Sequence, residues 1–397
     1  MVLLLNSDNI LSYLSDSALI RNSAPGEGGA IQPKPGKNFN LRVTCKDGDW
    51  LVKQESHGLS NRAAGELERE YQFFHLLKGS ALEEVRSQVI APIHFDKQNA
   101  IIVFPYLPHA QSLSDSFRSN RAAPLLAPST AASLGRFFAT LHSRTFHNQN
   151  CKALSQHFSQ KGFRHRHTTS PNFLRGLRQL TPESFCVIPT DALKFFRFYQ
   201  RHPEIGEAIA QLEREFERCC IVHNDPRFAN FLQHENGKII PIDWEKWEWG
   251  DPAYDLARLI ANYLKLWLRS LPVSADLDLG TILSRAGLPL SAIQPSVAQL
   301  MQSYLTHFPC VLQRRPDFVV QVVQFVGLAL IRQVQLTIAQ KHPCGNIEMA
   351  MAQVAKTLLC QPESAISTVF GCERTTLEAA NMQAIGKREL PREAQKR

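Results

Sequence analysis

Apolar residues in the first part of the chain recur in short runs that predict a small antiparallel sheet carrying one helix. Phe39 to Val43 alternates like a strand, and Trp50 to Gln54 is its expected return strand because a Lys-Asp-Gly-Asp turn lies between them. Helical spacing follows over 62–77, and two further buried strands are predicted over 89–93 and 100–104.

The rest of the chain has mainly helical periodicity. A proline-marked linker at 105–108 ends the last of these strands, and helices are predicted over 131–143 and 205–216. Two short strand-like runs, 219–222 and 238–242, interrupt the pattern and bracket a polar cluster. Beyond this cluster, helical spacing returns in four stretches: 253–270, 291–306, 316–341 and 346–360.

Composition narrows the class of protein without selecting a function. The 397 residues are 44% hydrophobic and 20% charged, which allows two packed lobes and argues against bulk disorder. The formal net charge of +8 favours anionic partners such as nucleotides, acidic peptides, nucleic acids or anionic membranes. A solvated basic surface explains the same excess, so charge alone does not choose among them.

Cysteine usage and the start of the chain predict a soluble, cytoplasmic protein. Nine cysteines occur, with no C-x-x-C pair, so free thiols fit better than a disulfide framework or a zinc site. Met1 to Leu5 is apolar, but it is too short for a signal peptide and lacks a basic flank. The most apolar later stretch, Phe318 to Ile331, is too short to span a bilayer and is expected in the core.

The polar cluster carries the residue types that phosphoryl transfer needs. Asp225 precedes Asn230 by five residues, which is the spacing of Asp and Asn in the kinase catalytic loop H-R-D-x-x-x-x-N. Asp243 follows at the end of a strand, after a hairpin with an Asn-Gly turn. Mg²⁺ prefers hard oxygen ligands and takes one or two carboxylates together with phosphate oxygens. The cluster therefore predicts a metal-dependent phosphoryl-transfer site.

Three motifs in this region resemble the signature of one family. They are H-N-D-P-x-x-x-N from His223, I-D-W-E from Ile242 and G-D-P-A-Y-D-L-A from Gly250. In this order they resemble the aminoglycoside phosphotransferase and choline kinase superfamily, which is similar to protein kinases in fold. That group lacks the D-F-G and A-P-E motifs, and so does this chain. The resemblance covers roughly residues 25–270.

The resemblance implies an α+β, bilobal protein-kinase-like fold, with a small antiparallel-sheet N-lobe carrying one helix and a larger, mainly helical C-lobe. It implies a Mg²⁺-dependent kinase that uses ATP and has an alcohol group as acceptor. The expected parts are an N-terminal helix at 1–24, a nucleotide-binding N-lobe at 25–106, a helical C-lobe with the catalytic loop and substrate site at 107–371, and a flexible charged tail at 372–397.

Carried over residue by residue, the family pattern assigns roles in the C-lobe motifs. Asp225 would be the catalytic base or the carboxylate that orients the hydroxyl, and Asn230 and Asp243 would hold Mg²⁺. His223 would order the loop rather than shuttle protons. Asp255 resembles the structural aspartate that pins the catalytic loop, so we expect it to affect stability.

The same pattern assigns nucleotide-binding residues in the N-lobe. Lys53 would pair the α- and β-phosphates, and Glu70 on the following helix would pair with Lys53. Glu66, one helical turn earlier, is the alternative partner because one sequence does not fix the rotation of a helix. The adenine would lie against a hinge formed by Phe104, Tyr106 and Leu107.

The phosphate loop departs from the family pattern. Relatives often carry a loop rich in Gly and Ser before the second strand, whereas this chain has Gly36 as its single glycine, directly after a proline that offers no N–H. Lys37 would supply positive charge instead. The departure bears on nucleotide affinity rather than on the reaction class.

Several side chains near these motifs have a plainer interpretation. Trp244, Trp247 and Trp249 could stack on a substrate, but packing beneath the metal loop is favoured. The basic stretch at 144–180 looks irregular, and it fits either an acidic substrate or a solvent-facing surface.

The acceptor is the least determined part of the function. Related phosphotransferase-like kinases of lanthipeptide maturation phosphorylate Ser or Thr of a precursor peptide, and a partner lyase then eliminates the phosphate. Three segments of this chain resemble that subgroup: Lys34 to Asn40, Arg314 to Phe318 and Thr368 to Gly371. A precursor peptide is therefore the leading hypothesis. The alternatives are a small alcohol (an aminoglycoside, a choline-like amine or a sugar) and a pseudokinase that only binds a peptide. No nucleic-acid motif occurs, so neither a nucleic-acid nor a membrane partner is expected.

Overall fold

The computed structural model describes residues 3–21, 30–34, 38–55, 65–79, 82–118, 123–160, 177, 186, 188–274 and 276–379. Its internal contacts divide the chain into two compact units. Unit 1 comprises Met1–Ser112, Ala153–Arg164 and Asn230–Glu248, and unit 2 comprises Leu113–Lys152, His165–Ala229 and Trp249–Arg397.

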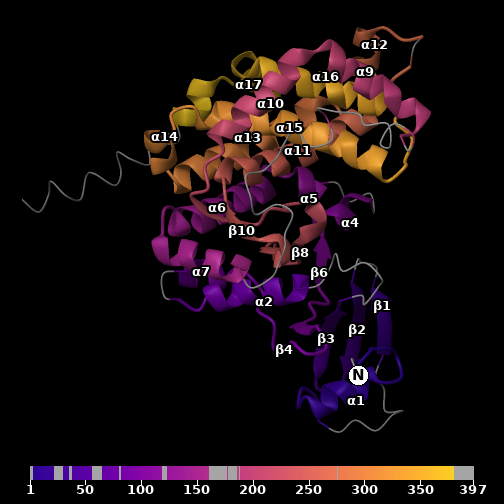
Figure 1. The fold of residues 1–397 in the computed structure, drawn as a ribbon, viewed down its shortest axis with the longest axis vertical. Helices are drawn as coiled ribbons and strands as arrows, with labels where there is room; N and C mark the ends of the chain where they lie inside the picture. The colour runs from indigo at the N-terminus through magenta and orange to yellow at the C-terminus, as the bar shows by residue number, and fades with distance from the viewer. Residues whose placement is uncertain are drawn as a thin grey trace, which may run out of the picture. The chain divides into compact units, whose positions relative to one another are not determined.

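A tight hairpin begins the main sheet of unit 1, as the sequence predicts. Strand β2 (Phe39–Cys45) pairs antiparallel with β3 (Gly48–Gln54) (Figure 1). Strand β5 (Ile101–Pro105) adds to the other side of β3, with Val103 opposite Val52. The predicted hairpin and the strand at 100–104 are therefore confirmed.

The strand predicted over 89–93 is wrong in position. The chain pairs instead as β4 (His94–Asp96), which lies antiparallel to β5. Pro92 has no N–H to donate to a ladder, and pairing begins only after it, where the Ile93 N–H donates to the Val103 carbonyl at 2.9 Å. A short helix, α3 (Glu83–Arg86), precedes this segment.

One further strand lies within residues 25–36, which are rich in Gly and Pro and for which no strand was predicted. Strand β1 (Ala30–Lys34) pairs with β2 and completes the sheet order β1-β2-β3-β5-β4. Pro33 is tolerated there because an edge strand needs to donate hydrogen bonds on one side only.

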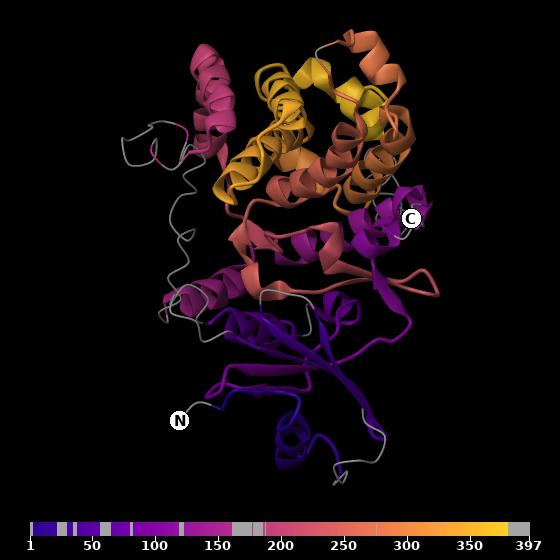
Figure 2. The ribbon, with the colours of Figure 1, turned by 90° about the vertical axis from the view of Figure 1, so that its right-hand side faces the viewer.

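The alternation of strand side chains gives the sheet two faces, each covered by a helix of unit 1. Helix α1 (Ile10–Asp16) buries its apolar residues against Val52 and its neighbours on one face. Helix α2 (Glu66–Leu76) lies on the other face (Figure 2). There the Phe74 ring contacts the Phe104 ring edge-on, with centroids 6.0 Å apart. Because adjacent strand residues point to opposite faces, Lys53, the neighbour of Val52, points to the α2 side.

A second, three-stranded sheet in unit 1 contains the predicted motif hairpin. Strands β8 (Phe231–His234) and β9 (Ile239–Pro241) pair antiparallel, and β6 (Ala110–Ser112) lies on the other side of β8. Gly237 in the connecting turn has φ 81°, a left-handed conformation that glycine adopts without steric cost. This turn explains why the chain reverses between the two motif segments.

Unit 2 is mainly helical and includes one short sheet, in which β7 (Cys220–Val222) pairs with β10 (Glu248–Gly250). Its first helices are α4 (Leu113–Arg118), α5 (Ala123–Leu126), α6 (Pro128–Thr145), α9 (Leu193–Arg201) and α10 (Pro203–Glu215). Its later helices are α11 (Pro252–Ser270), α12 (Leu279–Ser284), α13 (Leu290–His307), α14 (Cys310–Arg314), α15 (Phe318–Ala339), α16 (Asn346–Cys360) and α17 (Pro362–Phe370). The helices predicted from periodicity are thus present.

Helix α15 forms the centre of the helical core. It packs against α11 and α16 (Figure 1), and Gly327 allows the close approach, since a Cβ there would lie 2.8 Å from the Ala355 carbonyl oxygen of α16. By length and composition α15 could cross a membrane, but 56% of its most apolar window is buried inside the protein. The core helix of a folded protein can have the same length and apolar composition, so these two properties alone are weak evidence for a membrane span.

Two expectations about irregular segments need correction. Within the basic stretch at 144–180, residues 149–160 form helix α7 (Gln149–Gln160), because the Asn148 side chain accepts hydrogen bonds from its first backbone N–H groups. Residues 161–176 and 178–180 of that stretch lie outside the described residues. In the predicted tail, residues 374–379 are helical and Leu377 is fully buried, so ordered structure continues beyond 372.

Candidate active site

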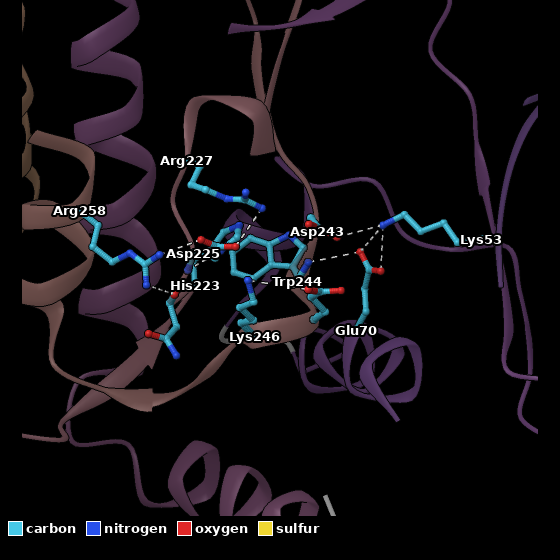
Figure 3. Close-up of polar contacts among 11 residues, drawn as sticks. Lys53, Glu70, His223, Asp225, Arg227, Asp243, Trp244, Lys246 and Arg258 are labelled. Atoms are coloured by element: carbon cyan, nitrogen blue, oxygen red, sulfur yellow. Dashed lines mark hydrogen bonds and ion pairs between the residues drawn. The ribbon is translucent and has the colours of Figure 1, made fainter. Parts of the chain in front are cut away.

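Three charged side chains meet on the α2 side of the main sheet, all within unit 1. The Lys53 Nζ lies 3.1 Å from Glu70 Oε2 and 3.3 Å from Asp243 Oδ1 (Figure 3). Lys53 comes from β3, Glu70 from α2, and Asp243 from the segment that follows β9. The partner that Lys53 contacts is Glu70 rather than Glu66. The sequence order of a lysine strand, a glutamate helix and a later aspartate thus becomes one cluster.

Burial sets the electrostatics of this cluster. Burial raises the pKa of Glu70, while Lys53 and the Trp244 N–H, 3.3 Å from its Oε1, oppose the rise. Burial alone would lower the pKa of Lys53, but the carboxylates of Glu70 and Asp243 outweigh it and hold that pKa above its usual value. Lys53 is therefore a fixed positive charge at neutral pH, as a phosphate ligand must be.

Local backbone conformation places Asp243 beside Asn230. Asp243 has φ 68° and ψ 58°, a left-handed conformation that is uncommon outside glycine and clusters at functional sites. The Ile242 N–H donates to the Asn230 carbonyl at 3.0 Å, just before the β8–β9 ladder begins. Asn230 and Asp243 therefore flank the open end of one hairpin, which fixes the two predicted metal ligands relative to each other.

The donor set at this hairpin end fits Mg²⁺. Asn230 offers an amide oxygen and Asp243 a carboxylate that is 26% exposed, and Mg²⁺ is held by few protein oxygens together with those of a nucleotide. Among the described residues, no group of three or more His, Cys, Asp and Glu side chains is arranged to hold a metal ion. A soft, thiol- or imidazole-rich metal site is accordingly not found there.

Helix α2 is tied to the segment after Asp243 by reciprocal contacts. The Arg69 side chain donates to the Trp247 carbonyl from Nε at 2.8 Å, and the Trp247 indole N–H donates back to the Arg69 carbonyl at 2.7 Å. The Phe73 and Trp244 rings are stacked, with centroids 3.8 Å apart. These contacts hold Glu70 against Asp243 within unit 1.

The tryptophans in the second motif and between it and the third motif are structural. Trp244, Trp247 and Trp249 are each at most 7% exposed, and the Trp249 indole N–H donates to the Arg218 carbonyl at 2.9 Å. The packing interpretation is confirmed, and substrate stacking by these rings is excluded by their burial.

The predicted catalytic carboxylate lies in unit 2 on the loop after β7. Asp225 is only 2% exposed, and Arg258 Nη2 contacts its Oδ1 at 2.8 Å while Arg227 Nη2 contacts its Oδ2 at 3.2 Å (Figure 3). Arg258 also donates from Nη1 to the Asn224 carbonyl at 2.8 Å, and Asn224 has φ 61°. A strained loop clamped by one arginine holds the carboxylate in a defined orientation.

Asp255 pins this loop from below. It is fully buried on the first turn of α11 and accepts the His223 N–H on Oδ2 at 2.7 Å and the Asn224 N–H on Oδ1 at 2.8 Å. His223 is fully buried as well, and its Nδ1 lies 3.4 Å from the Asp225 nitrogen. These positions are those of an aspartate and a histidine that order the loop.

We expect Asp255→Asn to destabilise the protein without touching the reacting groups. The asparagine amide can accept only one of the two backbone N–H groups, and a buried unsatisfied donor costs about 1–3 kcal/mol. Thermal unfolding followed by circular dichroism measures the loss. Asp278→Asn is the matched control, because Asp278 caps exposed α12 and asparagine caps equally well. Equal melting temperatures for the two variants would contradict the pinning role.

Asp251, in the third motif, makes a buried ion pair that the sequence did not predict. Its two carboxylate oxygens lie 2.8 and 3.0 Å from the Arg315 guanidinium, and they also accept the Ala253 and Glu217 N–H groups. Asp251 is fully buried and Arg315 is 8% exposed. Burial alone would lower the pKa of Arg315, but Asp251 more than offsets this and raises it.

The three predicted hinge residues differ in burial and in the groups that they contact. Phe104 is buried beneath Lys53, whose Nζ lies 5.3 Å from the ring centroid. The Arg42 guanidinium lies over the Tyr106 ring, 4.2 Å from its centroid, and the Tyr106 backbone N–H donates to the Asp49 carbonyl at 2.8 Å. Leu107 accepts the Ala110 N–H on its carbonyl at 3.3 Å. Their contact with adenine stays a prediction, and the predicted phosphate-loop residues Gly36 and Lys37 lie outside the described residues.

Sequence reasoning missed the arginines that support the site. Arg258 lies three residues after Asp255 on α11, so helical spacing alone could have placed both on the face toward the catalytic loop. Arg69 directly precedes Glu70 on α2, and adjacent helix positions do not share a face, so spacing gave no signal for it. Arg315 had no such signal, because its partner is sixty-four positions away.

Comparison with known proteins identifies related chains. A sequence model described as the phosphotransferase enzyme family matches residues 33–288, which is more than half of the chain. No curated protein sequence matches this chain significantly.

Solved structures give a likeness in fold. An ethanolamine kinase from Plasmodium vivax is similar with a TM-score of 0.50 and 15% identity, over 90% of this chain and 85% of that one. A choline/ethanolamine kinase family protein from Mesorhizobium loti has a TM-score of 0.46 and 16% identity, over 92% and 99% of the two chains. Choline kinase LicA from Streptococcus pneumoniae has a TM-score of 0.44 and 13% identity, over 89% and 98%. The α+β, protein-kinase-like fold expected from the motifs is confirmed.

Proposed function

The chain belongs to the phosphotransferase enzyme family, and we propose that it transfers the γ-phosphoryl group of ATP to a hydroxyl group. The observation that carries the proposal is the intact Lys53–Glu70–Asp243 cluster, because a buried lysine that is already paired with Glu70 has no structural need of a second, partly exposed carboxylate. The clamped Asp225 supports it independently in unit 2.

The proposed reaction is a direct displacement. The acceptor oxygen attacks the γ-phosphorus, the bond from that phosphorus to the β–γ bridging oxygen breaks, and ADP leaves. Asp225 orients the hydroxyl and receives its proton, while Arg258 holds the carboxylate in place. Lys53 would bind the α- and β-phosphates, with Glu70 fixing its direction. Protein groups supply positioning and charge rather than covalent chemistry.

We also propose that the reaction requires Mg²⁺, and the oxygen donors of one hairpin end support this. Asn230 and Asp243 would hold Mg²⁺, which when bound neutralises charge on the phosphate oxygens. A bound cation would compete with Lys53 for Asp243, and Lys53 would then be available to the phosphates.

We extend the proposal to the acceptor as a Ser or Thr hydroxyl of a precursor peptide, followed by elimination on a partner lyase. Resemblance to phosphotransferase-like kinases of that kind and the net charge of +8 support it. A small alcohol is the alternative, since a chain of similar fold is named an ethanolamine kinase. A pseudokinase is disfavoured because the ionisable groups of both clusters are intact.

Nucleotide binding should depend on Mg²⁺ and on Asp243. ATP at about a hundredfold excess over its Kd should stabilise the native state by roughly 2.7 kcal/mol, because it binds only the folded protein. Thermal shift with ATP, with and without Mg²⁺, measures this for the wild type and for Asp243→Asn. We expect a Mg²⁺-dependent rise in Tm that the variant loses.

The control for this experiment is Glu83→Gln, which removes one exposed acidic charge from α3 of the same unit. It should keep the full shift. A wild-type Tm that does not respond to ATP or GTP with Mg²⁺ would contradict the proposed function, and the pseudokinase alternative would replace it.

A further inference from the structure

One face of helix α11 carries a row of three cations and one amide that begins at the catalytic loop. Arg258, Asn262, Lys265 and Arg269 occupy positions i, i+4, i+7 and i+11 and therefore share one side of the helix. The first two residues of this row contact the loop: Arg258 binds Asp225, and Asn262 donates to the Pro226 carbonyl at 2.9 Å. The row thus starts at the reacting carboxylate.

The second half of the row, Lys265 and Arg269, forms no hydrogen bond with the catalytic loop among the described residues. Lys265 is half-buried, and its Nζ lies 3.4 Å from the Gln333 amide oxygen of α15, while Arg269 is exposed. Within the part of the chain that the structure describes, neither Lys265 nor Arg269 forms an ion pair with a carboxylate. A half-buried lysine paired only with a neutral amide is unusual, because burial of a charge is costly unless a counter-charge accompanies it.

The charges around Lys265 are mostly of its own sign. Burial, and then Arg269, Arg258 and Arg227, lower the pKa of Lys265 to about 8, and Asp225 is the carboxylate that opposes them. Asp225 is already bound by two of these four cations, and the Asp255 carboxylate attracts Arg258 but is itself engaged by the His223 and Asn224 N–H groups. Such a set repels an amine and attracts an anion.

We propose that the acceptor carries an anionic group, a carboxylate or phosphate, which binds Lys265 and Arg269 while the acceptor hydroxyl reaches Asp225. This inference rests on the proposed function, and it adds the substrate class. Lys265 lies seven residues beyond Arg258, which is about 10 Å along the helix axis. Because Arg258 holds Asp225, the anion and the hydroxyl of the acceptor should be separated by roughly that length. An acidic segment of a serine peptide and a hydroxylated small phosphate both offer this chemistry.

Matched acceptors test the proposal. One arm compares a serine peptide whose neighbouring residues are glutamate with the same peptide carrying glutamine, and the other compares glycerol 3-phosphate with glycerol and ethanolamine. ADP release measures turnover, and thermal shift in ADP and Mg²⁺ measures acceptor binding. We expect the anionic member of at least one arm to bind at least tenfold more tightly than its uncharged match. Equal or tighter binding of the uncharged or amine members in both arms would overturn the proposal.

Variants separate the proposed subsite from a structural role of Lys265. Lys265→Met with Arg269→Gln should raise the KM of the anionic acceptor about tenfold or more, with kcat nearly unchanged and the ATP thermal shift intact. Lys356→Met is the matched control, because Lys356 is a partly buried lysine of α16 that pairs with Glu204 at 3.1 Å. Unchanged acceptor affinity in the double variant would overturn the inference.

The pH dependence gives a readout that packing would not produce. Lys265 attracts an anion only while protonated, so anionic acceptor affinity should fall as pH rises through about 8, and the uncharged acceptor should show no such fall. Loss of the ATP and Mg²⁺ thermal shift would refute the proposed function itself. An intact shift without anion preference would refute only this inference.

Discussion

Asp225→Asn should reduce kcat by about 10²–10⁴ while the protein stays folded. The loss has this size because general-base catalysis by one positioned group contributes that factor, and an amide cannot receive the hydroxyl proton. Asparagine has nearly the same shape, so its oxygen can still accept from Arg258, which lies 2.8 Å from Oδ1. ADP release in steady state measures kcat, and circular dichroism checks the fold.

Arg227→Gln is the control for this experiment. It removes the contact of the exposed Arg227 with Asp225 Oδ2 at 3.2 Å but keeps the carboxylate and its Arg258 clamp. We expect a much smaller reduction in kcat, because the reacting group remains. Turnover of Asp225→Asn within a few-fold of the wild type would show that another group receives the proton.

Arg315→Ala should lower the free energy of unfolding by about 3–5 kcal/mol, because removing one partner of a buried pair leaves an uncompensated charge. Asp251 is fully buried, and its two oxygens also satisfy backbone N–H groups at the start of α11 and at Glu217. Loss of Arg315 therefore weakens the segment that leads into the helix carrying Asp255 and Arg258. The fall in Tm measures the effect.

The control is Arg374→Ala, which also removes an arginine with carboxylate partners from unit 2. Arg374 is 28% exposed, and exposed pairs contribute about 0–1 kcal/mol, so its Tm should change little. Arg315→Lys should fall between the two, because lysine keeps the charge but loses the two-pronged contact. Similar Tm values for all three variants would contradict a stabilising role for the buried pair.

The sequence determined the reaction class and much of the local structure. The five-residue spacing from Asp225 to Asn230 and the hairpin before Asp243 are short-range features, and such features survive in the fold because turns and strand alternation are set by neighbouring residues. The same alternation placed Lys53 on the face opposite Val52. The prediction of a strand at 89–93 was wrong because it used only the hydrophobic pattern, which does not take account of the missing N–H of Pro92.

Only the tertiary structure decided which distant groups meet. Glu70 rather than Glu66 contacts Lys53, since the rotation of α2 is fixed by the stacking of Phe73 on Trp244 and by the Arg69–Trp247 hydrogen bonds. The pairing of Asp251 with Arg315 likewise depends on long-range packing of helices. The sequence gives the helical spacing of Arg258, Lys265 and Arg269, but only the structure shows that, among the described residues, Lys265 and Arg269 form no ion pair with a carboxylate. A sequence fixes local spacing, whereas burial and counter-charges are properties of the packed chain.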